Sequence, residues 1–432
     1  MTPSPSRREV LTHGSAAALG ISLPSFPSPF VRLQDAEPAA PGGAEMLKVG
    51  LIGCGGRGTG AAAQALRADP NTKLVALADA FGDQLESSLA SLQATEDIAA
   101  KVDVDEDHRF TGFDGYKGVI ESCDVVLMAT SPFFRPQHVE ACVEAGRHMF
   151  VEKPVATDGP GLRRIWQACR DASAKGLSVV SGLCYRYQFA KQETMKRVHD
   201  GEIGDITAMQ CTYNTGELWH RGNRPEWSQM EFQMRNWLYF AWLSGDHIAE
   251  QHIHSLDKIA WAKGAYPVKC TSSGGRIKRT GEEYGNVYDH FNTVYEWEDG
   301  VKGFSSCRQW HGTKHDVSDH VFGTKGVAHL QTHRIESEAG RWRYRGEGPD
   351  DMYQNEHDAL FKAIRDGEPI NNGDYMCQSS LMALMGRLAA YTGKEITADE
   401  ALNSQEDLSP PALEWGDVET RPVAVPGIKQ FV

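Results

Sequence analysis

The chain has 432 residues, of which 41% are hydrophobic and 24% charged, and its formal net charge at pH 7 is −14. This composition is typical of globular proteins, and the length allows two domains. The acidic charge argues against nucleic acid or an anionic membrane as the main partner. No apolar run is long enough to span a membrane. The nine cysteines lack C-x-x-C pairs and zinc-ligand spacing, so we expect buried thiols and no disulfide framework.

The first residues have the order of a twin-arginine export signal. Arg7 and Arg8 precede a mildly apolar stretch at 16–23, and a segment rich in proline and alanine follows at 24–43. We therefore expect residues 1–44 to be a signal and linker read by the twin-arginine export machinery, which carries folded proteins. The protein is then periplasmic or otherwise exported. The alternative is a disordered basic tail.

A glycine-rich fingerprint follows the strand-like run at 47–52. Residues 53–58 read G-x-G-x-x-G and lead into an alanine-rich helical segment, which is the context of a dinucleotide-binding unit. Gly53 would allow the tight turn, Gly55 the approach of a pyrophosphate, and Gly58 the packing of helix on strand. By itself the pattern also fits a glycine-rich loop between two packed elements. The cofactor-binding residues expected here are Gly53, Gly55, Gly56, Arg57 and Gly58.

A second strand pattern at 73–79 ends in Asp79, at the spacing expected of the carboxylate that binds the adenosine ribose. A carboxylate there repels a 2′-phosphate, and residues 80–82 contain no arginine to neutralise one, so the sequence favours NAD over NADP. The alternative role of Asp79 is a cap of the next helix. Further strand patterns at 124–130 and 148–151 predict an α/β fold with a parallel, doubly wound sheet.

The last of these strands runs into Glu152-Lys153-Pro154. Together with the fingerprint, Asp79, Thr130-Ser131-Pro132 and His138, this motif resembles the glucose–fructose oxidoreductase / inositol dehydrogenase / MocA (Gfo/Idh/MocA) family. The resemblance covers nearly the whole chain after residue 46. It implies that the cofactor site also includes Thr130, Pro132, His138, Glu152 and Lys153.

The resemblance also implies two domains and an oligomer. We expect a Rossmann NAD-binding domain at 45–157, an α+β substrate domain with a large, mostly antiparallel sheet at 158–400, and a tail at 401–432. The tail, rich in proline after Leu408, is expected to wrap another surface or a neighbouring subunit of a homo-oligomer, a dimer or tetramer. Helical patterns lie near 158–175, 189–200, 353–364 and 375–391, and strand patterns lie at 206–215, 268–276, 287–297 and 301–309.

The segment 245–257 carries the expected catalytic groups. Read as one helix, it places Asp246, Glu250 and His254 on one face. Oxidation of a secondary alcohol requires the hydroxyl proton to leave with the hydride, and His254 is the natural general base. Lys153 would stabilise the developing alkoxide, and Glu250 would orient or charge-balance the other two. The family usually has aspartate at position 250, which leaves the role of this carboxylate open.

Metal and substrate sites are less well defined by the sequence. Glu250 and His254 have usable ligand geometry, but spacing fixes no second ligand pair, so we expect no catalytic metal. The stretch 213–242 holds four of the ten tryptophans, and aromatic faces stack on sugar rings. For these tryptophans, packing in the core or at an interface is the alternative to sugar binding. Arg186 and Tyr187 are also expected to face the substrate, and their alternative role is a polar rim at the domain junction. The expected substrate-binding residues are Arg186, Tyr187, Trp219, His220, Asp246 and His254.

Three classes of function fit these features. The first is an oxidoreductase that uses tightly bound NAD to oxidise a CH–OH group of a sugar, cyclitol or related polyol by hydride transfer. The second is a redox-neutral, NAD-dependent glycoside hydrolase or lyase that oxidises a ring hydroxyl transiently; export favours it, because free NAD is absent outside the cytoplasm. The third is a non-catalytic binding protein, against which the presence of Lys153 and His254 argues.

Overall fold

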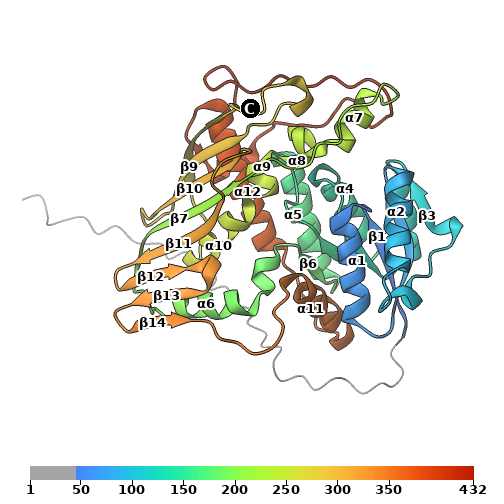
Figure 1. Ribbon diagram of the computed structural model, residues 1–432, viewed down its shortest axis with the longest axis horizontal. Coiled ribbons are helices and arrows are strands. Elements are labelled where there is room, and N and C mark those ends of the chain that lie inside the picture. The colour runs from blue at the N-terminus through green and yellow to red at the C-terminus, as the bar shows by residue number, and fades with distance from the viewer. Residues whose placement is uncertain (1–44) are drawn as a thin grey trace, which may run out of the picture. The chain divides into compact units, whose positions relative to one another are not determined.

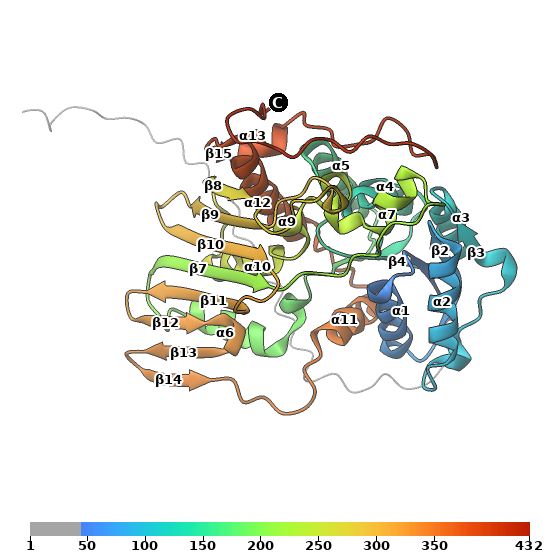
Figure 2. The same ribbon diagram turned by 45° about the horizontal axis from the view of Figure 1, so that its top comes forward.

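Two β-sheets organise the chain, as the computed structural model shows for the described residues 45–432 (Figure 1). The predicted export signal at 1–44 lies outside the described residues. One sheet has six strands and the other nine, and helices separate and flank them (Figure 2). No helix within 45–432 is long and apolar enough to cross a bilayer.

The six-stranded sheet is parallel throughout, in the order β3-β2-β1-β4-β5-β6. Its central strands are apolar because helices cover both faces, and every residue of β4 is buried. This confirms the predicted doubly wound sheet. The strands are β1 Leu47–Ile52, β2 Thr72–Asp79, β3 Arg109–Thr111, β4 Val125–Met128, β5 His148–Val151 and β6 Val179–Ser181. The helices are α1 Gly56–Ala68, α2 Gly82–Gln93, α3 Gly115–Ser122, α4 Arg135–Glu144 and α5 Gly159–Ala174, with short 3-10 turns η2 Ala99–Lys101, η3 Glu106–His108 and η4 Pro132–Phe134.

The nine-stranded sheet has the order β14-β13-β12-β11-β7-β10-β9-β8-β15 and is antiparallel except between β7 and β10. Side chains alternate between a covered inner face and an outer face, as the burial of every second residue in β10 shows. The predicted mostly antiparallel sheet is therefore confirmed. The strands are β7 Ile206–Thr215, β8 Lys269–Gly275, β9 His290–Glu296, β10 Lys302–Gln309, β11 Asp316–Gly323, β12 Gly326–His329, β13 Arg334–Ser337, β14 Gly340–Arg343 and β15 Ile396–Thr397.

Helices α10 and α12 pack on the inner face of this sheet (Figure 2). Every residue of α12 from Ser379 to Thr392 is buried, which explains its richness in Met, Leu and Ala. The helices of this half are α6 Phe189–His199, α7 Gln229–Arg235, α8 Ala241–Ser244, α9 His247–Glu250, α10 Ile253–Lys263, α11 Met352–Asp366, α12 Gly373–Thr392 and α13 Ala398–Asn403. Short 3-10 turns are η5 Cys184–Tyr187, η6 Trp237–Tyr239, η7 Glu282–Tyr284 and η8 Leu330–Thr332.

The segment 245–257 is not one helix, which corrects the prediction. Gly245 and Asp246 have φ values of 74° and 71°, in the left-handed region that no α-helix continues. The Asp246 carboxylate instead accepts a hydrogen bond from His247 N at 2.6 Å and caps the four-residue helix α9. Helix α10 then begins at Ile253. Glu250 and His254 therefore lie on two different helices.

The chain returns to the first sheet after leaving it. Val179 of β6 donates to Ile370 O at 2.7 Å, and Asn372 N donates to Val179 O at 2.8 Å. Helix α11 packs on α1. The segment 352–372 thus completes the edge and one face of the six-stranded sheet. The bounds 45–157, predicted from the sequence for the Rossmann domain, do not include this returning segment.

Candidate active site

The glycine loop after β1 has the shape that a dinucleotide needs. Gly53 has φ of 96°, and a Cβ at Gly58 would lie 1.9 Å from the carbonyl oxygen of Gly53, so only glycine allows α1 to start this close to the strand. At Gly55 and Gly56 nothing lies within 4 Å of the Cβ position. This open space sits at the N-terminus of α1, where free backbone N–H groups attract a pyrophosphate. The residues present fit a nicotinamide dinucleotide.

Asp79 lies beside this loop at the end of β2. Its carboxylate accepts hydrogen bonds from Cys54 N at 2.7 Å and from Phe81 N at 2.9 Å, and burial raises its pKa. Helix α2 begins after Phe81 without a side-chain cap, so Asp79 does not have the alternative role of helix cap. The carboxylate is fixed where the adenosine ribose of a Rossmann cofactor binds.

Thr130, Pro132 and His138 lie after β4, and an arginine that the sequence did not single out ties Thr130 to the Glu152-Lys153-Pro154 motif. Arg135 donates to Thr130 O at 2.5 Å and to Pro154 O. His138 is buried, with Nδ1 3.5 Å from Thr130 Oγ1. Burial and the nearby Arg135 charge lower the pKa of His138 to about 3. His138 therefore holds the Thr130 loop as a neutral side chain.

Lys153 extends from the end of β5 across to the second half of the molecule. Its Nζ donates to the backbone carbonyl of Glu250 and lies 3.2 Å from Glu250 Oε1. Both side chains keep some exposure, 13% for Lys153 and 16% for Glu250. The two residues are 97 positions apart in sequence. The structure thus brings together the lysine and the carboxylate that the sequence assigned to catalysis.

His254 lies in the first turn of α10, close to these two groups. Burial, followed by the positive charge of Lys153, lowers its pKa well below the ordinary value. Its Nδ1 is buried without a hydrogen-bond partner among the described residues. The ring meets Tyr185 edge to face at 5.3 Å. Tyr185 was missed in the sequence, although it directly precedes the highlighted Arg186 and Tyr187. The imidazole is neutral and able to accept a proton.

Asp246 is placed differently from the prediction of a substrate contact. Its side chain has no exposed surface, and its oxygens accept from His247 N, Tyr288 N at 2.7 Å and the Tyr391 hydroxyl at 2.6 Å. These bonds fix the turn before α9. Asp246 positions Glu250 from within the core and has no surface to offer a substrate.

Arg186 and Tyr187 are also engaged within the protein. Arg186 pairs with Asp257 at 2.8 Å, and its guanidinium lies over the ring of Tyr375 at 4.1 Å. The Tyr187 hydroxyl donates to Asn372 Oδ1 at 2.6 Å. This arrangement matches the alternative of a polar junction between the two halves.

The aromatic stretch packs against the nucleotide side of the molecule. Trp219 is 38% exposed, with its ring 6.2 Å from that of Trp237. His220 Nε2 lies 2.9 Å from Glu283 O. Trp237 belongs to an apolar cluster that includes Phe81, Phe113, Phe133 and Phe134 of the first half. Packing, the alternative to sugar stacking, therefore accounts for much of this stretch.

Two segments distant in sequence cover the loop that follows Asp79. The Trp415 ring lies 5.4 Å from Phe81 and 4.6 Å from Phe113. The Arg235 guanidinium of α7 lies 3.9 Å over Phe81 and pairs with Asp83 at 3.0 Å. We call Phe81, Phe113, Arg235 and Trp415 the aromatic cover. The tail, expected to wrap another surface or a neighbouring subunit, here packs on its own chain.

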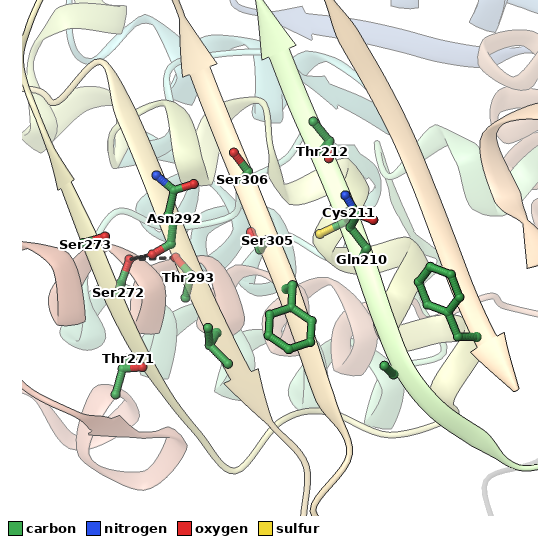
Figure 3. Close-up of a pocket in the computed structure, with 14 residues that line it drawn as sticks. Gln210, Cys211, Thr212, Thr271, Ser272, Ser273, Asn292, Thr293, Ser305 and Ser306 are labelled. Atoms are coloured by element: carbon green, nitrogen blue, oxygen red, sulfur yellow. Dashed lines mark hydrogen bonds between the residues drawn. The ribbon is translucent and has the colours of Figure 1, made fainter.

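Other candidate sites lie apart from these residues. Among residues 45–432, no group of three or more His, Cys, Asp and Glu side chains is arranged to hold a metal ion. A pocket opens on the outer face of the nine-stranded sheet (Figure 3), and none of the residues predicted for the active site lines it. The polar side chains Gln210 and Asn292 share this face with Phe304 and Phe322, which are 49% and 36% exposed.

Two models of one protein family match the chain. Residues 47–180 match the oxidoreductase family with an NAD-binding Rossmann fold, and residues 192–329 match the GFO/IDH/MocA C-terminal domain. The chain therefore belongs to the Gfo/Idh/MocA family of oxidoreductases. The resemblance seen in the Glu152-Lys153-Pro154 motif is confirmed.

Individual relatives are distant. A 2,7-anhydro-N-acetylneuraminate hydratase of Escherichia coli is 26% identical over 52% of this chain and 55% of its own length. An inositol 2-dehydrogenase of Rhizobium meliloti is 22% identical over 75% of this chain and 90% of its own. A levoglucosan dehydrogenase structure in complex with NADH and levoglucosan matches with a TM-score of 0.64 and 19% identity, over 82% of this chain and all of that one. The chain spans about half the length of the first curated relatives it matches.

Proposed function

We propose that the protein is an NAD-dependent oxidoreductase that removes hydride from a CH–OH group of a sugar, cyclitol or related polyol. The observation that carries this proposal is the contact of Lys153 with Glu250, together with a neutral His254 in the first turn of α10 and an open glycine loop after β1. The names of the inositol and levoglucosan dehydrogenases support the substrate class.

The three side chains divide the work of alcohol oxidation. When bound, NAD supplies the hydride acceptor. The neutral imidazole of His254 accepts the hydroxyl proton, so that the alcohol becomes a carbonyl as the hydride leaves. The ammonium of Lys153 stabilises negative charge on the substrate oxygen. Glu250 holds Lys153 Nζ through its carbonyl and carboxylate, and so fixes the direction from which the charge acts.

NAD rather than NADP fits the ribose end of the site. Asp79 presents a carboxylate that a 2′-phosphate would repel. The structure adds Arg235 near this end, but its guanidinium is already paired with Asp83 at 3.0 Å and with Glu231 at 2.8 Å. Three carboxylates thus surround one arginine, which leaves little positive charge for a 2′-phosphate.

We further propose that the cofactor is tightly held and that the protein works outside the cytoplasm after twin-arginine export. The aromatic cover supports retention, because it lies over the loop after Asp79, where the adenosine half binds in this fold. The order of charges and apolar residues in 1–44 supports export. An export assay with residues 1–44 fused to a reporter tests this, and Arg7→Lys/Arg8→Lys should abolish transport.

A redox-neutral reaction is the second candidate. A cofactor that does not exchange must be restored in each turnover, either by a second substrate or by returning the hydride to the same one. The E. coli relative is named a hydratase, and hydration involves no net oxidation. We therefore keep an NAD-dependent glycoside hydrolase or lyase as the alternative.

One experiment separates the two. The purified protein is offered a panel of sugars, cyclitols and aryl glycosides, while absorbance of reduced nicotinamide and release of aglycone are followed together. Net reduction supports the oxidoreductase, and aglycone release without reduction supports the redox-neutral enzyme. Lys153→Ala should lose either activity and still bind NAD. Full activity in that variant would refute the mechanism.

We also propose that the outer face of the nine-stranded sheet pairs with another copy of the chain in a homo-oligomer. The exposed rings of Phe304 and Phe322 support this, since large apolar side chains on a flat sheet face gain from burial. Light scattering tests it: Phe304→Asp should dissociate the oligomer, whereas Ile277→Asp, an exposed apolar residue outside this pocket, should not. A monomeric wild type would refute it.

A further inference from the structure

Arg57 lies inside the glycine fingerprint but does not serve the glycine loop. Its Nε donates to Glu152 Oε1 at 2.5 Å, one terminal nitrogen to Glu356 Oε1 at 2.7 Å, and the other to Gln64 Oε1 at 2.8 Å. Three of its five N–H donors are therefore used within the protein. The sequence had placed Arg57 among the expected cofactor-binding residues.

The partners of Arg57 lead directly to Lys153. Glu152 is 7% exposed, and its second oxygen, Oε2, accepts a hydrogen bond from the backbone N–H of Lys153 at 3.1 Å. Gly182 leaves room for this carboxylate, because a Cβ there would lie 2.6 Å from Glu152 Oε2. The same carboxylate thus binds the fingerprint arginine with one oxygen and the catalytic motif with the other.

Two aromatic rings also lie against the guanidinium, and the Arg57 side chain remains 30% exposed. The rings of Tyr353 and Phe150 lie 4.9 Å and 5.5 Å from it. Glu356, on the returning helix α11, has no exposed side-chain surface, and burial raises its pKa well above the ordinary value. A planar guanidinium with a fork of donors suits this arrangement, whereas a lysine would reach one carboxylate at a time.

We propose that Arg57 is a positioning residue that fixes Lys153 through Glu152 and thereby links the dinucleotide loop to the catalytic lysine. The inference rests on the proposed function only in calling Lys153 catalytic; the link is a property of the chain. Without Arg57, two neighbouring carboxylates lose their shared cation. Glu152 then leaves its place, and the backbone of Lys153 loses its acceptor.

Competitive labelling with acetic anhydride tests the link without any substrate. Peptide mass spectrometry measures the labelling rate of Lys153 against that of the exposed Lys196 in the same sample. In the wild type the Lys153 side chain is 13% exposed and held on Glu250. In Arg57→Gln we expect Lys153 to react at least threefold faster than in the wild type. NAD affinity, measured by calorimetry, should stay within threefold of wild type. Arg57→Lys should give an intermediate rate.

Two further variants separate the link from general loosening. Gly182→Ala displaces the Glu152 carboxylate while Arg57 itself is unchanged in sequence. It should accelerate the labelling of Lys153 to the same extent. Glu356→Gln removes the other carboxylate but leaves the Glu152 pair, and should stay within twofold of wild type. If Arg57→Gln does not fold, Gly182→Ala and Arg57→Lys carry the test.

Two results would overturn the inference. The first is unchanged Lys153 labelling with NAD bound at least thirtyfold more weakly, which would make Arg57 a phosphate ligand. The second is unchanged labelling with a lower Tm, which would make it a packing residue. If the wild type binds no NAD at all, the proposed function fails, and the labelling comparison still decides the role of Arg57.

Discussion

Removing the Trp415 side chain should release NAD faster. The ring forms two aromatic pairs, with Phe81 at 5.4 Å and Phe113 at 4.6 Å. Each such pair contributes about 0.5–1.5 kcal/mol, so Trp415→Ala weakens the closed cover by about 2 kcal/mol. If the cover must open before the adenosine half leaves, this makes opening, and hence dissociation, roughly thirtyfold more frequent, at about 1.4 kcal/mol per factor of ten.

A stopped-flow chase measures this directly. Protein loaded with NADH is mixed with excess NAD, and the decay of nicotinamide fluorescence gives the dissociation rate. Trp219→Ala is the matched control, since Trp219 is 38% exposed, compared with 46% for Trp415, and its aromatic pair is with Trp237. A Trp415→Ala rate within twofold of wild type would refute a gating role for the tail. Equal acceleration in Trp219→Ala would point to general loosening.

Three more predictions concern backbone, base and charge. Gly58→Ala places a Cβ 1.9 Å from Gly53 O, so α1 must move; calorimetry should show NAD binding at least tenfold weaker, whereas Gly60→Ala, whose nearest neighbour is 3.6 Å away, should bind normally. The pKa of His254 is lowered, so protonation of this base begins only below its ordinary value; the pH–rate profile should show no loss from His254 between pH 8 and 6.5, and a fall with a midpoint near 6.5 would contradict this. Burial lowers the pKa of Lys191 to about 7, so the unfolded chain binds more protons above that pH; the free energy of unfolding should rise from pH 7 towards 10, by at most about 1.4 kcal/mol per pH unit, and urea titrations of Lys191→Met should lose this rise while those of the exposed Lys196→Met keep it.

Local patterns predicted the parts of the fold that depend on local physics. The buried apolar strand at 124–130 and the glycine loop at 53–58 were recognisable because burial on both faces and a tight turn each demand particular residue types. The break at Asp246 was missed because an aspartate with positive φ leaves no regular pattern. Gly245 directly before it was the available signal, since glycine favours the left-handed region.

Contacts made by long side chains could not be read from spacing. Arg235 reaches Asp83 across 152 positions, and Arg57 reaches Glu356 across 299. The sequence near residues 80–82 contains no pattern that predicts a contact with an arginine of α7. The contact between Lys153 and Glu250 could be predicted because the family resemblance assigned both residues to one site. Periodicity alone does not predict this long-range contact.

The return of the chain to the first sheet sets an order on folding during synthesis. N-terminal domains usually fold first as the chain leaves the ribosome. Here one side of the edge strand β6 pairs with β5, but its other side finds hydrogen-bond partners at Ile370 and Asn372, and Arg57 finds Glu356 only with α11. The nucleotide-binding half can therefore complete its sheet only after most of the other half has been synthesised. Expressing the first half alone should yield an incomplete sheet, so fusions and tags belong at the chain ends rather than between the halves.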